Sequence, residues 1–148
     1  MTDVTDATPD APDDATAEAV LAETAVETVT EPPPAESFSD FPIHPDIVDA
    51  LAEHKITSPF PIQAMTLPVA LAGHDIIGQA KTGTGKTLGF GIPILNRVTS
   101  PKDAEFATMP YAGKPQALAV APTRELAVQV AGDLERAGKK RGVRVLTV

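Results

Sequence analysis

The chain has 148 residues, which is enough for one compact domain and leaves little room for a second. It contains no cysteine, which excludes disulfides, thiolate zinc sites and cysteine nucleophiles. The formal net charge of −8 is unevenly distributed. Residues 1–36 hold ten acidic residues and no Lys or Arg, so the rest of the chain carries the other 10 acidic residues, all 12 Lys and Arg, and a net charge of +2.

Residues 1–36 form an acidic tail that we expect to be disordered. The tail lacks aromatic residues and is built mostly from Ala, Thr, Asp, Glu and Val, so it offers too little apolar surface to offset the entropy of ordering. It has neither the basic nor the apolar region of a signal peptide, and no run in the chain approaches the ~18 consecutive apolar residues of a membrane span. We therefore expect a soluble cytoplasmic protein.

The first expected helix begins at Pro45 and ends near His54, because Pro suits a first helical position and Ile47, Val48 and Leu51 form an apolar stripe. The next segment, residues 58–73, is expected to form two short helical pieces. We expect the helix to be broken at Pro68 and to end at Gly73.

Three short apolar segments are expected to be buried β-strands: residues 74–79 (HDIIGQ), 117–121 (ALAVA) and 143–148 (VRVLTV). A helix over residues 87–98, kinked by Pro93, and a polar loop over 99–115 separate the first two strands.

An amphipathic helix from Arg124 to about Lys139 separates the last two strands, with Leu126, Val130 and Leu134 recurring every four residues. We expect Leu126 to lie in the core together with Ala127. Gly132 and Gly138 weaken the prediction of this helix slightly.

The alternation of strands and helices predicts an α/β fold, in which right-handed crossovers build a parallel sheet. Three strands are few for a sheet that must be covered on both faces. We therefore expect the chain to be the N-terminal piece of a longer protein.

The sequence AKTGTGKT, residues 80–87, is typical of a loop that holds nucleotide phosphates. Gly85, Lys86 and Thr87 match the general pattern, and Ala80 replaces its first Gly. Gly83 and Gly85 let successive backbone N–H groups converge on phosphate oxygens, at the positive end of the following helix. Lys86 is expected to reach the β- and γ-phosphates, and the Thr87 hydroxyl to ligate Mg²⁺. The loop by itself does not distinguish ATP from GTP.

Three further stretches, FSDF, SPFPIQ and APTRELAVQ, accompany this loop. Together they resemble the N-terminal RecA-like domain of a DEAD-box RNA helicase, over residues 38–148. The resemblance implies a P-loop parallel sheet with flanking helices. It divides the chain into an acidic tail (1–36), a Q-motif region (37–65) and a partial ATP-binding domain (66–148) that stops before the family's Asp-Glu-Ala-Asp segment.

The resemblance also implies an ATP site. An upstream aromatic stacks on adenine in this family, and Phe38 stands at the matching distance, with Phe41 as its competitor. Gln63 matches the glutamine whose amide distinguishes adenine from guanine, although a glutamine that caps a turn is the commoner structural role. Lys55 and Ile56 replace the Gly and the aromatic of the Q motif. The expected nucleotide contacts are Phe38, Lys55, Ile56, Pro59, Gln63, Ala80, Lys81, Thr82, Gly83, Thr84, Gly85, Lys86 and Thr87, of which Lys86 and Thr87 are the expected catalytic residues.

The family's motif Ia is matched at residues 122–127, where Pro122, Thr123 and Arg124 are expected to hold the RNA backbone. Thr123 reads as a helix N-cap directly after a strand, at the edge of an α/β sheet where ligands bind. A hydroxyl and a guanidinium at a helix N-terminus can bind a backbone phosphate, and such contacts do not distinguish one base from another. The basic run at 139–141 either contacts RNA as well or complements the dipole of the preceding helix.

The parent protein is thus expected to be an ATP-dependent RNA helicase that unwinds short duplexes locally, with ATP and Mg²⁺ as cofactors. The 148 residues alone lack the Asp-Glu-Ala-Asp and Ser-Ala-Thr motifs and the second domain, and are expected to be inactive. A related DNA helicase and a non-enzymatic ATP- or RNA-binding module are the alternatives.

Overall fold

The computed structural model describes residues 36–148, so the expected disorder of the acidic tail lies outside the described residues. Four α-helices and two short 3₁₀ helices make up the regular structure of this part of the chain. In chain order they are η2 (Phe38–Asp40), α1 (Pro45–Glu53), α2 (Pro61–Leu71), α3 (Lys86–Arg97), η3 (Ala104–Thr108) and α4 (Arg124–Gly138).

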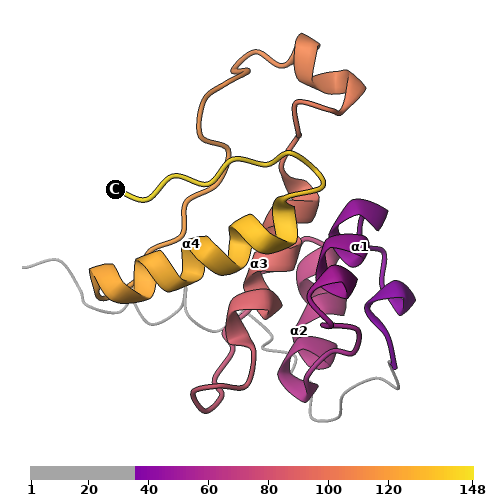
Figure 1. Ribbon diagram of the computed structural model, residues 1–148, viewed down its shortest axis with the longest axis vertical. Coiled ribbons are helices and arrows are strands. Elements are labelled where there is room, and N and C mark those ends of the chain that lie inside the picture. Colours follow the sequence, from indigo (N-terminus) through magenta and orange to yellow (C-terminus); the bar gives the residue numbers. More distant parts are fainter. Residues whose placement is uncertain (1–35) are drawn as a thin grey trace, which may run out of the picture.

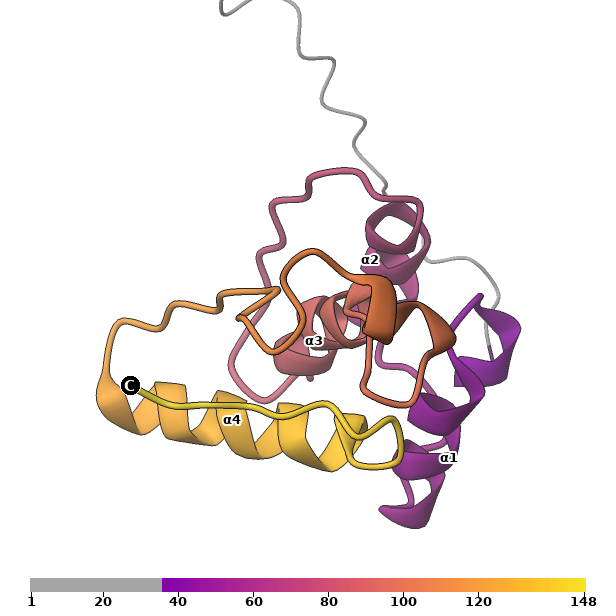
Figure 2. The same ribbon diagram turned by 90° about the horizontal axis from the view of Figure 1, so that it is seen from above.

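Helix α3 lies at the centre, between α2 and α4, and α1 packs against α3 and α4 (Figures 1 and 2). The side chains between these helices form one hydrophobic core, and burying such side chains is the main force that holds a small domain together. Its buried members are Phe38, Ile43, Ile47, Leu51, Leu67, Ile92, Leu95, Leu134 and Ala137. The expected boundary between residues 65 and 66 falls inside α2, and this core contains residues from both sides of it.

Two glycines allow α3 and α4 to approach closely. A Cβ atom added to Gly91 would lie 2.6 Å from Leu134 Cδ2, and one added to Gly138 would lie 2.8 Å from Leu95 Cδ2. Both distances are far shorter than carbon atoms tolerate, so larger residues would push the helices apart. Gly138, which lowers the helix propensity of α4, is therefore required by packing.

The expected helix boundaries are confirmed for α1, which begins at Pro45, and for α4, which begins at Arg124. Helix α3 is also confirmed, with Pro93 inside it. The expected break at Pro68 is wrong, because α2 continues through that residue as one helix. Pro68 is exposed on the outside of α2, while its neighbour Leu67 is fully buried, so packing of the helix holds it together across the proline.

The three expected strands do not form a sheet. Within residues 36–148 no strand is assigned, and no backbone–backbone hydrogen bond involves residues 75–79, 117–121 or 144–148. A β-strand in a sheet is defined by backbone hydrogen bonds to a neighbouring strand, and these segments make none to one another. The loop at 99–115 is confirmed as mostly irregular, but it contains η3.

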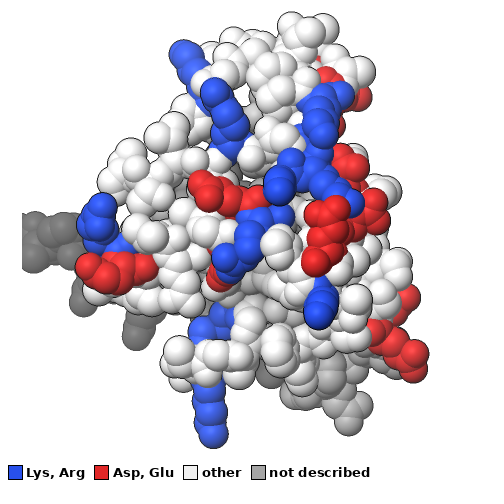
Figure 3. Space-filling view, in the orientation of Figure 1, with Lys and Arg blue, Asp and Glu red and all other residues white. Residues whose placement is uncertain are grey.

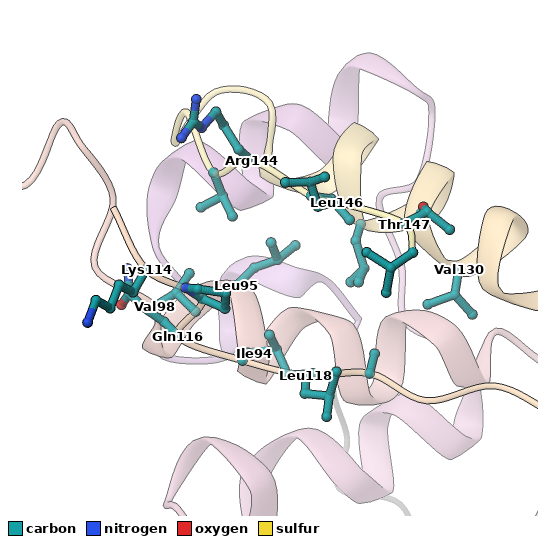
Figure 4. Close-up of a pocket in the computed structure, with 18 of the residues that line it drawn as sticks. Ile94, Leu95, Val98, Lys114, Gln116, Leu118, Val130, Arg144, Leu146 and Thr147 are labelled. Carbon is teal, nitrogen blue, oxygen red and sulfur yellow. The ribbon is translucent and has the colours of Figure 1, made fainter. Parts of the chain in front are cut away.

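Residues 117–121 and 143–148, together with side chains of α3 and α4, line a hollow of about 670 Å³ (Figure 4). In Figure 4, Leu118 lies on one side of it and Leu146 and Thr147 on the other, with Leu95 and Val130 of the helices between them. Residues 143–148 turn back after α4 and run alongside it (Figures 1 and 2). Among the described residues, no helix is both long and apolar enough to cross a membrane.

Candidate nucleotide and nucleic-acid sites

The Gly-rich loop at residues 80–87 leads directly into α3. Gly83 and Gly85 have φ angles of +84° and +76°, a region that side chains with a Cβ disfavour, so these two glycines are required by the curl of the loop. Gly85 is the N-cap of α3, and Lys86 and Thr87 are its first helical residues. The free N–H groups and the positive end of α3 therefore lie at the position expected for phosphates.

The ammonium group of Lys86 is held by its own loop. Lys86 Nζ donates hydrogen bonds to the carbonyl oxygens of Lys81, at 2.8 Å, and of Ala80, while Thr84 Oγ1 donates to Lys81 O at 2.7 Å. Lys81, Thr82 and Gly83 are exposed, whereas Lys86 and Thr87 are half-buried. The loop thus places one cation at its centre, surrounded by backbone.

Helix α2 packs against the exit of this loop through Gln63. The Gln63 side chain is only 1% exposed, and its Nε2 donates to Gly85 O at 2.8 Å while its Oε1 accepts from Phe60 N at 2.9 Å. The second bond caps the N-terminus of α2, where backbone N–H groups have no partner within the helix. Gln63 therefore lies beside the phosphate loop, with its amide bonded to backbone. Its contact with adenine stays a prediction.

The other expected base contacts lie elsewhere. Phe38 is 1% exposed and belongs to the core, so in this structure its ring presents no face to a ligand. Phe41 and Ile56 pack against the same core. Lys55 lies two residues after the end of α1 with a φ angle of +60°, and Pro59 is half-buried before α2. The roles of these residues in nucleotide binding stay predictions.

The N-terminus of α4 has the expected cap. Thr123 has extended backbone angles and its Oγ1 accepts a hydrogen bond from Leu126 N at 3.3 Å. Pro122, Thr123 and Arg124 are all exposed, as a contact with a nucleic-acid backbone requires. Leu126 was expected in the core but is 43% exposed, so that prediction is wrong, since the first turn of α4 extends beyond the helices that pack on it.

The basic residues after α4 are mostly engaged within the protein. Lys140 forms ion pairs with Glu53 at 2.9 Å and Asp49 at 3.8 Å, and the hydrogen bond to its ammonium lowers the pKa of the exposed Glu53 carboxyl. Arg141 is 4% exposed and donates to Asp103 at 2.7 Å and to Val98 O at 2.8 Å. Figure 3 shows basic and acidic side chains interspersed on this face. Lys140 and Arg141 thus tie helices and loop together, whereas Lys139 is exposed.

No group of three or more His, Asp or Glu side chains within the part of the chain that the structure describes is arranged to hold a metal ion.

The family is settled by comparison with known proteins. Residues 60–148 match the DEAD/DEAH box helicase family model, which covers more than half of the chain. The chain belongs to the DEAD/DEAH box helicase family.

Two curated relatives illustrate the similarity. The ATP-dependent RNA helicase RhlB of Pectobacterium carotovorum is 44% identical over 111 residues, covering 74% of this chain and 25% of the relative. The DEAD-box ATP-dependent RNA helicase CshA of Bacillus licheniformis is 40% identical over 112 residues, covering 76% of this chain and 21% of the relative. The chain thus spans about a quarter or less of the length of these relatives.

Solved structures give the fold class. Dbp5 of S. cerevisiae, bound to RNA and ADP BeF3, is 33% identical with a TM-score of 0.63, covering 74% of this chain and 26% of that one. A DEAD box protein from the hyperthermophile Methanococcus jannaschii is 30% identical, with a TM-score of 0.58. The match covers 69% of this chain and 25% of that protein's chain. The likeness confirms the RecA-like fold class of DEAD-box helicases, although no paired strand occurs within residues 36–148.

One residue at the site was not predicted from the sequence. Phe60 is 53% exposed and lies against Gly85, where a Cβ atom added to the glycine would be 2.8 Å from Phe60 Cδ2. Its place between Pro59 and Pro61 was the available signal, because the proline that follows a residue restricts that residue's backbone to extended angles.

Proposed function

We propose that this chain binds ATP at the loop of residues 80–87 and belongs to an ATP-dependent RNA helicase. The observation that carries the proposal is the geometry of the loop: two glycines with positive φ angles, the N-terminus of α3 and the half-buried ammonium of Lys86 converge on one place. In the free chain, backbone carbonyl oxygens accept hydrogen bonds from Lys86 Nζ. The phosphate oxygens of a bound triphosphate would take their place, because anionic oxygens bind an ammonium group more strongly than neutral oxygens do.

Magnesium is part of this proposal. The residues present fit a Mg²⁺ ion carried by the nucleotide, since Thr87 offers one hydroxyl and Mg²⁺ in such sites keeps waters and takes phosphate oxygens as its other ligands. When bound, the ion would neutralise charge on the β- and γ-phosphates. Lys86 would hold the same phosphates from the protein side.

RNA is the second proposed ligand. The similar Dbp5 structure has RNA bound, and both curated relatives are named RNA helicases. In this chain Thr123 and Arg124 offer an exposed helix N-terminus and a guanidinium, which suit the sugar–phosphate backbone of any sequence.

The activity of the whole protein is also a proposal, because the chain spans about a quarter of its curated relatives. We propose that the whole protein couples ATP hydrolysis to local unwinding of RNA duplexes in the cytoplasm, a location with which the lack of cysteine agrees. The three unpaired segments at 74–79, 117–121 and 143–148 are proposed to be strands of its parallel sheet. The 148 residues alone are expected to bind ATP without RNA-stimulated hydrolysis.

Binding of a fluorescent ATP analogue to the 148-residue chain tests the nucleotide site. Lys86→Ala is expected to weaken binding at least about a hundredfold, since a charge-assisted hydrogen bond and the positive charge are both lost. Lys139→Ala is the matched control, because this lysine is exposed and lies at the end of α4. Equal affinities of the unchanged chain and Lys86→Ala would refute the ATP site.

The RNA site is tested by titrating unrelated single-stranded RNAs at several salt concentrations. Arg124→Ala should weaken the binding of all these RNAs about equally. It should also reduce the slope of the logarithm of the binding constant against the logarithm of the salt concentration by roughly 0.7, which corresponds to one phosphate contact. A loss confined to one RNA sequence would mean that Arg124 reads bases, and the proposed role would be wrong.

A further inference from the structure

The C-terminal ends of α3 and α4 are joined by one buried arginine. Arg141 lies three residues after the end of α4 and is 4% exposed. Its Nη2 donates hydrogen bonds to Val98 O at 2.8 Å and to Asp103 Oδ2 at 2.7 Å. Val98 is the C-cap of α3, so its carbonyl lies at the negative end of that helix, where a cation is favoured. Arg141 therefore ties the chain that leaves α4 to the end of α3.

The loop that follows α3 completes this contact. Asp103 Oδ2 also accepts a hydrogen bond from Ser100 N at 2.7 Å. Ser100 is 1% exposed, and its hydroxyl donates to the Arg141 carbonyl, so both the guanidinium and the backbone of residue 141 are held. We call the four connected residues the clasp: Val98, Ser100, Asp103 and Arg141.

The clasp contributes directional contacts rather than much stability. Moving two charges out of water costs about as much as their attraction returns, so a buried ion pair is weak evidence for stability. Arg141 Nε is also buried without a hydrogen-bond partner among residues 36–148, which is unfavourable. A charge-assisted hydrogen bond, however, requires a particular distance and angle between its two groups. The clasp therefore fixes how the two helix ends lie relative to each other.

The apolar contacts between α3 and α4 restrain that geometry less. Leu134 packs over Gly91, and Leu95 packs over Gly138. These contacts determine how closely the helices approach. They are not directional, so they resist a change in the angle between the helices less than a set of hydrogen bonds does.

The opposite ends of the same two helices carry the two proposed ligand sites. The phosphate loop leads into the N-terminus of α3, and Thr123 and Arg124 form the N-terminus of α4. In Figure 1 the two helices come together at their C-terminal ends and diverge toward their N-terminal ends. Helix α4 has 15 residues and is roughly 22 Å long, so a change of about 5° at the joined ends moves its N-terminus by roughly 2 Å.

We propose that Arg141 is a positioning residue of the helicase reaction, which fixes the angle between α3 and α4 and thereby the spacing of the nucleotide and RNA sites. The proposal rests on the function proposed above. Arg141 lies at the joined ends of the helices, away from both N-termini, so it acts through the helices and not on a ligand directly. A fixed spacing lets bound nucleotide strengthen the binding of RNA. When the angle varies, this coupling weakens while each site by itself stays intact.

The test measures the affinity of the whole protein for a single-stranded RNA with and without a non-hydrolysable ATP analogue. The ratio of the two affinities is the coupling between the sites. Arg141→Met together with Asp103→Asn removes the ion pair without leaving one charge buried, and the Asn oxygen can still accept from Ser100 N. The ratio is expected to fall by roughly 3- to 30-fold, whereas the affinity for each ligand alone should stay nearly unchanged.

Arg136→Met is the matched control, because Arg136 pairs with Asp133 within α4 and joins no second element through that pair. Each variant is measured at a temperature at which circular dichroism shows it to be folded, so a loss of stability by itself leaves the ratio unchanged. An unchanged ratio in the double variant, or an equal fall in Arg136→Met, would overturn the proposal.

Asp103→Asn alone is the second variant, used if the double variant does not fold. It keeps the size of the side chain and weakens only the contact with Arg141, so the ratio should fall in the same direction. An unchanged ratio in this variant would also count against the role of Arg141. If the unchanged protein binds neither RNA nor the ATP analogue, the proposed function itself fails, which is a different result from a ratio that does not depend on the clasp.

Discussion

At the scale of single residues, the Gln63 carboxamide connects α2 to the phosphate loop through two backbone hydrogen bonds. It is buried, and the groups it satisfies are the Phe60 N–H and the Gly85 carbonyl. A carboxamide has a second N–H and a second lone pair, so adenine recognition by Gln63 would require part of the site to open. The structure therefore gives Gln63 a role in stability that is independent of any nucleotide.

Gln63→Ala is expected to lower the free energy of unfolding by about 2–6 kcal/mol. Each backbone group left without its partner in a buried site costs about 1–3 kcal/mol, and two are affected. Urea denaturation followed by circular dichroism measures the change. Gln129→Ala, at an exposed position of α4, is the control and should stay within about 0.5 kcal/mol. A loss for Gln63→Ala no larger than that of the control would contradict this role.

The candidate site was only partly predictable from sequence. The curl of the expected phosphate loop depends on local residues, since Gly83 and Gly85 have positive φ angles and Lys86 begins α3 directly after them, so the sequence could indicate this geometry. The aromatic contact depends on tertiary packing. Phe38 has the expected distance along the chain from Gln63, but its side chain is buried in the hydrophobic core, and spacing along the sequence does not reveal this.

At the scale of elements, the turn that follows α1 contains a residue in an unfavourable conformation. Lys55 adopts a φ angle of +60°, which lets the N–H groups of Lys55 and Ile56 bond to Ala52 O at 2.9 Å and Leu51 O at 3.0 Å. Such ends of helices usually carry Gly, because a Cβ in the left-handed region costs about 1–2 kcal/mol. Lys55 also stands where the Q motif of the family has Gly.

Lys55→Gly should therefore stabilise the chain, by about 0.5–1 kcal/mol after the greater entropy of an unfolded Gly is subtracted. A higher midpoint of urea denaturation with an unchanged m-value would measure it. Lys139→Gly is the matched control, because Lys139 has right-handed helical angles, φ −55° and ψ −49°, and the same change should destabilise. If both variants lost stability, Lys55 would not be strained.

Helices and strands differed in how well the sequence predicted them. The ends of α1 and α4 follow from Pro45 and from the Thr123 cap, which act locally. The break expected at Pro68 did not occur, because burial of Leu67 and of Gln63 on the same helix outweighs one missing hydrogen bond. The segments 117–121 and 143–148 have strand-like composition, but a strand also needs a neighbour, and composition does not specify one.

At the scale of the whole molecule, the unpaired segments leave apolar side chains in solvent. Leu118, Val120, Leu146 and Val148 are 82%, 85%, 85% and 111% exposed, and Ile77 is 104% exposed. Within residues 36–148, the backbone of residues 75–79, 117–121 and 144–148 makes no backbone–backbone hydrogen bond. Exposed apolar side chains next to unpaired N–H and C=O groups favour association with other extended chains.

The 148-residue chain is therefore expected to self-associate as its concentration rises, which sedimentation velocity would measure. Replacing Leu118 and Val120 together by Lys should shift the chain toward the monomer, because charges on an open strand oppose edge-to-edge pairing. Val128→Lys is the matched control: Val128 is 48% exposed, but it lies on α4, where the helix satisfies its own backbone, so association should persist. A chain that stays monomeric at all concentrations, or a control that dissociates equally well, would show that the open segments do not drive association.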